Sequence, residues 1–375
     1  MDGKKSKISV YIYICIFIAI LFMGTVLNVK NIPKAVTGGD YTDGFFGRYT
    51  FVEINGRITK KLGIKEMNER LLLDSGDSLV NPMYGNVWLF DNVEKTVDLS
   101  RKLSDKNIPF LYVQVPYEID MNDDEPILKT EHSDDVANEF LQRIRAEGVE
   151  CLDLRAYIAT EYPDYYEAFF RTDHHWKSET AFSAMGWISE YMEDRIFHES
   201  VPGEYKDPAS YETEIIEDSF LGANGRRTGK NYAGLDDFTV LTPKFETSLT
   251  LCDDNGELKT GSFDEVLLYR EYLDSDSLYE NSMYDVYTGL DRDYFKIINN
   301  EPVIDKKIFV VKDSFSRPVI AFMSTIYREI VAVDVRYNDP EKESLYEIID
   351  REDPDVVLMM YNPYMLGTEE GFDFE

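Results

Sequence analysis

The stretch Lys307–Val311, KIFVV, is where the fold of this sequence is most directly visible. Its run of apolar and largely β-branched residues is typical of a buried strand. Helices and strands are predicted in alternation after it, at Arg317–Tyr327 (helix), Glu329–Val335 (EIVAVDV, strand), Glu341–Arg351 (helix) and Val356–Met360 (VVLMM, strand). Because strands that alternate with helices form right-handed crossovers, this region predicts an α/β fold with a parallel sheet and helices on both faces.

The same alternation occurs earlier in the chain. Phe110–Val115 (FLYVQV) and Glu150–Leu154 are predicted strands. The spacing of apolar residues predicts four helices, at Val93–Lys106, Asp134–Glu147 (with Ser133 as its N-cap), Arg155–Glu161 and Lys177–Ile196. Ligands of such folds bind beyond the carboxyl ends of the strands, so residues that directly follow strands are candidates for function.

Residues 199–300 depart from this pattern. They are rich in Gly, Asp, Thr, Ser and Tyr, and they contain short alternating runs at Phe238–Leu241, Val266–Arg270 and Met283–Thr288. We expect them to form a β-rich insertion. Phe51–Ile58 (FVEINGRI) also alternates and contains an Asn-Gly turn signal, so a hairpin is predicted there.

The N-terminal region has the features of a membrane anchor. Ile8–Leu27 holds 20 residues without a charge, which matches the roughly 20 residues of a membrane-spanning helix. Lysines precede it, so this end is expected in the cytoplasm. The sequence predicts a cytoplasmic tail at 1–7, a transmembrane anchor at 8–28, a stalk at 29–44 and an extracytoplasmic domain at 45–375. The alternative is a cleaved signal peptide, whose apolar region is usually shorter, about 7–15 residues.

The composition excludes one class of partner. The 375 residues carry 71 acidic and 39 basic side chains, a net charge of −32. Such a chain lacks the basic face that binds nucleic acid, so no nucleic-acid partner is expected. Residues 1–30 contain four lysines and one aspartate, so the rest of the chain carries −35 by subtraction. This charge favours a neutral or weakly charged ligand, although Arg226, Arg227 and Lys230 form a local basic cluster.

The cysteines give little information about the fold. Cys15 lies inside the predicted anchor, which leaves Cys151 and Cys252 for the exported domain. Two cysteines in so large a domain do not form a disulfide scaffold, and whether they pair stays open. Their spacing from histidines does not match a zinc site.

Two short segments carry groups suited to chemistry. Arg171–Trp176 reads RTDHHW and holds two of the four histidines directly before a helix. Val311–Ser316 reads VKDSFS and lies in the turn between a predicted strand and a helix. A serine in such a turn lies beside helix N–H groups that can stabilise an oxyanion, and an imidazole from elsewhere in the fold can take its proton. The two segments therefore offer a nucleophile and a base.

Each segment also has a plainer interpretation. Ser314, which follows Asp313 at a helix start, fits an N-cap. Asp173, His174 and His175 are ligand types that suit several transition metals, although adjacent histidines at a helix start point about 100° apart. These alternatives stay open at this point.

Taken together, the D-H-H-W block at 173–176 and the D-S-F-S block at 313–316 resemble the DHHW protein family and the alginate O-acetyltransferases. The resemblance spans roughly residues 45–370, and as in those proteins the Asp–His pair precedes the serine. It implies an SGNH-hydrolase-like three-layer α/β/α fold. It also implies that Ser314 is the nucleophile of an acyl-enzyme, His175 its base and Asp173 the partner of His175.

Some positions depart from the pattern or extend it. Lys312 stands where an ordinary SGNH hydrolase has the Gly of G-D-S. The resemblance implies that Gly222 and Asn224, a G-x-N element, are oxyanion donors, while the alternative is an ordinary glycine-rich turn. Candidate substrate contacts are His174 and four residues that follow predicted strands: Arg336, Tyr337, Tyr361 and Asn362. At least two of these four are expected to be structural.

The resemblance implies a membrane-anchored extracytoplasmic O-acetyltransferase or acetylesterase that acts on a cell-surface polysaccharide at the bacterial cell membrane. No cofactor or metal is expected, and the acetyl group would come from a multi-pass membrane acyltransferase. The alternative is a non-catalytic glycan-binding or assembly protein on the same fold, which the Lys312 departure favours. A metal-dependent hydrolase is a third possibility. The distance between Ser314 Oγ and His175 discriminates between the first two.

Overall fold

The computed structural model describes residues 14–15, 18–19, 22–30, 45–74, 77–84, 90–120, 122–123, 128, 130–274, 276 and 278–375. The predicted tail, ten of the 21 residues of the predicted anchor and most of the predicted stalk lie outside these residues. Among the described residues, no helix combines the length and the apolar character needed to cross a membrane.

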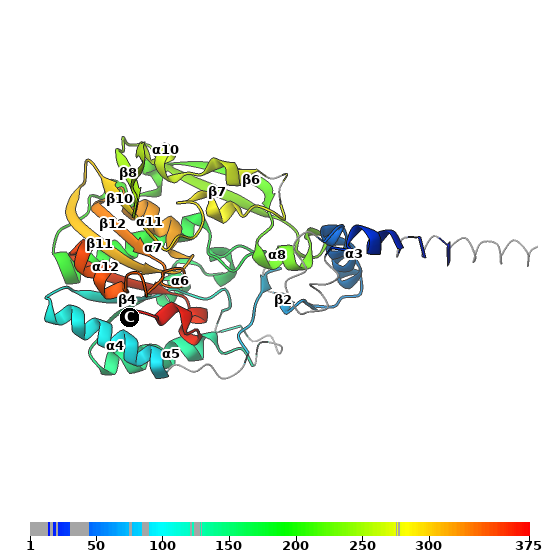
Figure 1. Cartoon of the computed structure of the whole chain (residues 1–375), viewed down its shortest axis with the longest axis horizontal. Helices are drawn as coiled ribbons and strands as arrows, with labels where there is room; N and C mark the ends of the chain where they lie inside the picture. Colours follow the sequence, from blue (N-terminus) through cyan, green and yellow to red (C-terminus); the bar gives the residue numbers. More distant parts are fainter. Residues whose placement is uncertain are drawn as a thin grey trace, which may run out of the picture.

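An eight-stranded sheet forms the centre of the domain, in the order β5-β4-β13-β11-β12-β10-β8-β9 (Figure 1). The first five strands in this order are parallel: β5 (Glu150–Asp153), β4 (Phe110–Gln114), β13 (Val356–Tyr361), β11 (Ile304–Lys312) and β12 (Tyr327–Val333). The KIFVV stretch lies within β11, between β13 and β12. The strands predicted from the sequence are therefore confirmed as the parallel centre of the sheet.

Helices cover both faces of the sheet. The α-helices from residue 45 onward are α3 (Arg48–Lys61), α4 (Phe90–Asp105), α5 (Ser133–Ala146), α6 (Arg155–Glu161), α7 (Ser178–Met192), α8 (Ala223–Thr228), α9 (Lys230–Ala233), α10 (Phe263–Leu267), α11 (Ser316–Met323) and α12 (Leu345–Glu352). Side chains alternate along a strand, so Ile308 and Val310 pack with α6, α7 and α11 in one core, while Phe309 and Val311 pack with α4, α5 and α12 in the other. The result is the predicted three-layer α/β/α arrangement.

The sheet is mixed, which corrects the prediction of a parallel sheet. Three antiparallel strands from the 199–300 region extend it beyond β12: β10 (Tyr294–Asn299), β8 (Leu249–Asp253) and β9 (Gly256–Gly261). The edge strand β9 is almost entirely exposed, as antiparallel strands tolerate and buried parallel ones do not.

The rest of the 199–300 region is only partly β. Strands β6 (Tyr211–Phe220) and β7 (Asp236–Pro243) form a separate antiparallel pair, and Phe238–Leu241 lies in β7 as predicted. The other two alternating runs are not strands. Val266–Arg270 begins inside α10, and Met283–Thr288 begins with a 3-10 turn.

The predicted hairpin at Phe51–Ile58 is wrong, because these residues belong to helix α3. Gly56 is buried where α3 crosses α8 and α9, and a side chain there would overlap the Thr228 carbonyl and lie 3.1 Å from Tyr232 Cβ. The Asn-Gly pair therefore serves close helix packing instead of a turn. A small antiparallel sheet follows, formed by β1 (Glu66–Met67), β2 (Arg70–Leu72) and β3 (Leu79–Val80).

Ser133 is not the N-cap of α5 but its first residue, and His132 precedes the helix. The Ser133 N–H donates to the Glu131 carboxylate at 2.7 Å, so Glu131 satisfies the group that a serine cap would have satisfied. The remaining helices agree with their predicted positions within a few residues.

Candidate active site

Ser314 lies in the turn between β11, which ends at Lys312, and α11, which begins at Ser316. Asp313 closes this turn, because its Oδ1 accepts a hydrogen bond from the Phe315 N–H at 2.9 Å. The Ser314 hydroxyl is half-buried and lies 2.7 Å from His175 Nε2. The interpretation of Ser314 as an N-cap is therefore wrong, and its hydroxyl faces the base.

The turn is fixed from the neighbouring strand. Asp313 Oδ2 accepts hydrogen bonds from both the backbone and the side-chain N–H of Asn362, at 2.8 and 2.7 Å. Burial raises the pKa of Asp313, although these donors act in the opposite direction. Asn362 was a candidate substrate contact, but its side chain is buried and used to hold the nucleophile turn.

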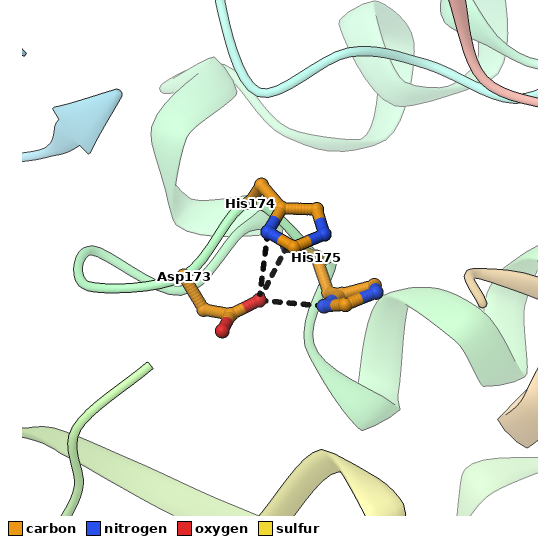
Figure 2. A group of neighbouring side chains, drawn as sticks. All are labelled: Asp173, His174 and His175. Atoms are coloured by element: carbon orange, nitrogen blue, oxygen red, sulfur yellow. Dashed lines mark hydrogen bonds and ion pairs between the residues drawn. The ribbon is translucent and has the colours of Figure 1, made fainter. Parts of the chain in front are cut away.

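Asp173 and His175 lie on the loop that precedes α7, and Asp173 Oδ1 lies 2.6 Å from His175 Nδ1 (Figure 2). The same oxygen accepts the His175 backbone N–H at 3.0 Å. A proton on Nδ1 that points at this carboxylate leaves Nε2 as an acceptor for the Ser314 hydroxyl. The three side chains predicted to act together therefore form one continuous chain of hydrogen bonds.

Asp173 is 1% exposed, and its other carboxylate oxygen binds a third donor. Its Oδ2 accepts the Ala223 N–H at 2.6 Å. Burial alone would raise its pKa, but the interactions with His175 and His174 and the bound donors outweigh burial, so the pKa of Asp173 lies well below its usual range. The carboxylate stays ionised and can orient the imidazole.

The predicted oxyanion role of Gly222 and Asn224 is wrong, because their donors are already used. The Gly222 N–H donates to Thr172 Oγ1 at 2.8 Å. The Asn224 amide donates to the Leu79 carbonyl at 2.8 Å and to Glu118 Oε2 at 3.0 Å. Instead, Ala223, the middle residue of the G-x-N element, donates its N–H to Asp173 Oδ2.

A buried polar network surrounds Asn224. Arg70 Nε donates to Asn224 Oδ1 at 2.7 Å, and Glu118 Oε1 accepts the Asn81 N–H at 2.7 Å. Burial first, with the nearby charge of Asp173, raises the pKa of Glu118 to about 8. The sequence motifs did not single out Arg70, Asn81 or Glu118, because they are spread over distant segments.

Asp236, at the start of β7, fixes the loop that carries the base. Its carboxylate accepts the N–H groups of Arg171 and Thr172 at 3.0 and 2.8 Å, and the Thr172 hydroxyl at 2.7 Å. No motif identifies Asp236 in the sequence. Its role follows only from the folded structure, in which the start of β7 lies beside this loop.

Aromatic side chains enclose the imidazole of His175. The Tyr284 ring is stacked on it, with centroids 3.9 Å apart and an interplanar angle of 15°, and Phe315 packs at 4.8 Å. The Phe315 carbonyl accepts Trp176 Nε1–H at 3.1 Å and the Tyr284 hydroxyl at 3.3 Å. These contacts join the base loop and the nucleophile turn through one carbonyl group.

Lys312, the departure from the expected glycine, is fully buried and paired. Its ammonium lies 3.0 Å from Asp334 Oδ2 and 3.1 Å from Asp291 Oδ1. Burial opposes ionisation of Asp291, but Lys312 and Arg317 lower its pKa to about 2. Lys312 is thus held by carboxylates and leaves the Ser314–His175 hydrogen bond intact.

Arg317 connects the same region to the segment 284–291. Its guanidinium donates to Asp285 at 2.5 Å and to the Gly289 carbonyl at 2.9 Å, and it lies 5.2 Å from the centre of the Tyr284 ring. The segment 284–291 therefore contacts His175 through Tyr284, α11 through Asp285 and the end of β11 through Asp291.

His174 lies at the edge of the site with 38% of its side chain exposed. Its Nδ1 is 3.6 Å from Asp173 Oδ1, so one carboxylate oxygen faces both histidines (Figure 2). Partial burial first, and then the charges of His175, Arg70 and Arg317, lower the pKa of His174, so it is neutral near pH 7.

The Asp173, His174 and His175 ligand atoms all lie within 4.8 Å of one another, as a metal site requires. Both ring nitrogens of His175 are engaged, however, one with Asp173 and the other with Ser314. A metal bound through His175 would have to displace one of these partners. The arrangement fits a hydrogen-bonded chain better than the metal alternative.

The remaining predicted substrate contacts have different positions. Tyr361 is fully buried and donates to the Gly371 carbonyl at 2.6 Å, so it is structural like Asn362. Arg336 binds Asp334 through two nitrogens, at 2.8 and 2.6 Å. Tyr337 beside it is 55% exposed. Tyr361 and Asn362 are thus buried in hydrogen bonds that hold the fold, while a substrate contact at Arg336 or Tyr337 stays a prediction.

Comparisons with known proteins agree with this architecture. A family model described as "SGNH hydrolase-like domain, acetyltransferase AlgX" matches residues 85–220, which include Asp173 and His175 but not Ser314. No curated protein matches the sequence significantly.

Solved structures match over most of the chain. Bacillus cereus PatB1 is 20% identical, with a TM-score of 0.64, and the match covers 82% of this chain and 100% of that one. A second PatB1 structure, with a sulfonyl adduct, has the same identity and TM-score and covers 82% and 99%. A DHHW family protein from Eubacterium siraeum is 18% identical, with a TM-score of 0.61, and covers 82% and 95%. The predicted resemblance is thus confirmed: the chain is similar to the SGNH-hydrolase-like acetyltransferase family over residues 85–220 and to a DHHW family protein in its fold.

Proposed function

We propose that this protein is an extracytoplasmic serine O-acyltransferase, anchored in the bacterial cell membrane by residues 8–28, that places acetyl groups on hydroxyls of a cell-surface polysaccharide. The observation that carries the proposal is the hydrogen-bonded chain from Asp173 through His175 to Ser314, with distances of 2.6 and 2.7 Å. The description of the matching family model as an acetyltransferase supports acetyl as the transferred group.

The reaction has two halves. Ser314 Oγ attacks the carbonyl carbon of an acetyl donor while its proton passes to His175 Nε2. The bond from that carbon to the leaving group then breaks, and the leaving group takes the proton, so an acetyl ester of Ser314 remains. A sugar hydroxyl next gives its proton to His175 and attacks the same carbon, and Ser314 recovers a proton as it leaves. Asp173 orients the ring and stabilises the imidazolium in both halves.

The developing oxyanion needs a donor other than Gly222 and Asn224. In the described part of the chain, the Ser314 N–H donates to no other backbone or side-chain group. It lies at the amino end of α11, where the helix dipole favours negative charge. We therefore assign this N–H as an oxyanion donor.

The acceptor decides between transferase and esterase. The acyl-enzyme is common to both, and water in place of a sugar hydroxyl would make the site an acetylesterase. Ser314 and His174 are partly exposed while Asp173 and His175 are buried, so the acceptor approaches from the side of Ser314 and His174. A neutral His174 ring can hydrogen-bond a sugar hydroxyl there, and the exposed Tyr337 is a second candidate contact.

The proposed anchor would keep the domain close to a source of acetyl groups. It keeps the domain at the membrane, where a multi-pass membrane acyltransferase can supply the acetyl donor. The acidic domain favours a neutral or weakly charged polysaccharide as acceptor, since like charges repel.

Covalent trapping at Ser314 tests the proposal. A sulfonyl fluoride or fluorophosphonate should label Ser314 in the wild-type chain, as read by peptide mass spectrometry, and Ser314→Ala should lose both labelling and acetyl transfer to an oligosaccharide. Thr160→Ala, at an exposed position near the end of α6, is the matched control and should keep both. Full activity of Ser314→Ala would overturn the mechanism, and glycan binding without labelling in the wild type would favour the non-catalytic alternative.

A further inference from the structure

Helix α3 presents an apolar stripe to the outside of the molecule. Phe51, Ile54 and Ile58 are 58%, 52% and 52% exposed, and Leu62 just after the helix is 68% exposed. Intervals of three and four residues place these side chains along one side of the helix. The opposite side, at Gly56, packs against α8 and α9. The described part of the chain leaves the stripe uncovered.

Basic residues flank this stripe in an otherwise acidic protein. Residues 45–65 contain five basic side chains and one acidic one, whereas the whole chain has a net charge of −32. Arg57 and Lys61 are exposed next to the stripe. The cluster of Arg226, Arg227 and Lys230 lies on α8 and α9, to which α3 is packed. An exposed apolar stripe with basic flanks is the pattern of a helix that lies in the headgroup region of an anionic membrane.

The start of α3 lies beside the end of the predicted anchor. Asn28 directly follows the uncharged stretch Ile8–Leu27, and its side-chain oxygen accepts the Phe46 N–H at 2.7 Å, just before α3. The helix that contains residues 22–27 leaves the domain at the end where α3 lies (Figure 1). If residues 8–28 span the bilayer, Asn28 lies near the headgroups, and the start of α3 lies there with it.

We propose that the outer face of α3 docks on an anionic phospholipid bilayer, with its apolar stripe toward the acyl chains and Arg57 and Lys61 at the lipid phosphates. The inference rests on the proposed anchor and adds a second membrane contact to it. Gly56 of α3 packs on Thr228 of α8, and Ala223 of α8 holds Asp173. The docked helix therefore fixes the orientation of the active site relative to the membrane, which a single anchor would leave free to rotate.

Tryptophan fluorescence of the full chain in vesicles tests this contact. Ile54→Trp is reconstituted in phosphatidylcholine–phosphatidylglycerol vesicles with brominated acyl chains, and the signal of the wild-type tryptophans is subtracted. Ile215→Trp is the matched control, because Ile215 on β6 is 59% exposed. We expect bromine to reduce the added emission at least twofold for Ile54→Trp and to leave Ile215→Trp unchanged. Arg57→Glu with Lys61→Glu should diminish the quenching, and so should vesicles without phosphatidylglycerol.

The outcomes separate this contact from the anchor. A wild-type chain that fails to float with the vesicles would overturn both proposals. A chain that floats but shows no quenching at Ile54→Trp overturns only the docking of α3. Emission that is blue-shifted yet insensitive to bromine would identify a protein surface, such as a second copy or a membrane partner, as the occupant and would also overturn the proposal.

Discussion

At the residue scale, Gly222 shows how little space the site leaves. A Cβ at this position would overlap the Asp173 side chain and lie 2.6 Å from the Thr172 carbonyl. We expect Gly222→Ala to displace Asp173 and to lower kcat about 10²-fold with a smaller effect on KM, because misplacing a catalytic group by about 1 Å has this effect. Steady-state kinetics with an acetyl ester measure it.

The chain offers a matched glycine as a control. Gly186 lies in α7, and a Cβ there would meet nothing within 4 Å. Gly186→Ala should keep wild-type kinetics and stabilise the fold by up to about 1 kcal/mol, since alanine is the better helix former. Equal kinetics for the two variants would show that the close approach at Gly222 does not position Asp173.

Glu118 gives the fold a specific pH dependence. Its pKa is raised from 4.5 to about 8, first by burial. The folded state therefore holds a proton that the unfolded state releases between these values, and stability should fall as pH rises through this window. Between pH 5 and pH 7 the loss is about 3 kcal/mol.

Unfolding of the full chain in detergent by urea, at several pH values, isolates this contribution. The free energy of unfolding of Glu118→Gln relative to wild type should increase with pH across the window, because the glutamine does not titrate. Any fixed cost of placing an amide beside Asn224 shifts the curve without changing its slope. A difference that is flat from pH 5 to pH 8 contradicts the assignment.

At the element scale, the segment 284–291 supports the base and the nucleophile turn, a role that no sequence motif predicted. Tyr284 stacks on His175 and bonds the Phe315 carbonyl, while Asp285 and Asp291 pair with Arg317 and Lys312. Tyr284→Ala should lower kcat about 10²-fold by freeing the imidazole. Tyr284→Phe, which keeps the stacked ring, should stay within tenfold of wild type. If kcat is unchanged in Tyr284→Ala, the stacking does not hold the base.

The elements also show which features the sequence could predict. KIFVV, EIVAVDV and VVLMM are buried on both faces, so their composition alone indicates strands of a parallel sheet. The segments with Asp173, His175 and Ser314 were recognisable because the chemistry demands those residue types. In contrast, FVEINGRI alternates like a strand yet forms α3, since the packing of Gly56 on α8 outweighs local pattern. The donors of Gly222 and Asn224 could not be assigned without knowing that Thr172, Leu79 and Glu118 lie next to them.

At the scale of the whole molecule, charge is distributed unevenly. The chain beyond residue 30 carries −35 by subtraction, while residues 45–65 are basic. If residues 8–28 anchor the chain, as proposed, an anionic membrane would attract the basic end at 45–65 and repel the acidic remainder, which would orient the domain. This polarity fits the proposed reaction, in which the acetyl group comes from the membrane and the acceptor is a polymer beyond it.

The same distribution predicts how salt affects the choice of acceptor. Transfer to an anionic oligosaccharide should be slow at low ionic strength and should rise up to about tenfold in kcat/KM as salt is added, because the acidic domain repels that acceptor until its field is screened. Transfer to a neutral oligosaccharide of equal length should change less than twofold, and ester hydrolysis serves as the control for effects of salt on the acyl-enzyme itself. If the anionic acceptor instead reacts faster at low salt, the local basic cluster of Arg226, Arg227 and Lys230 guides it, and the polysaccharide is acidic.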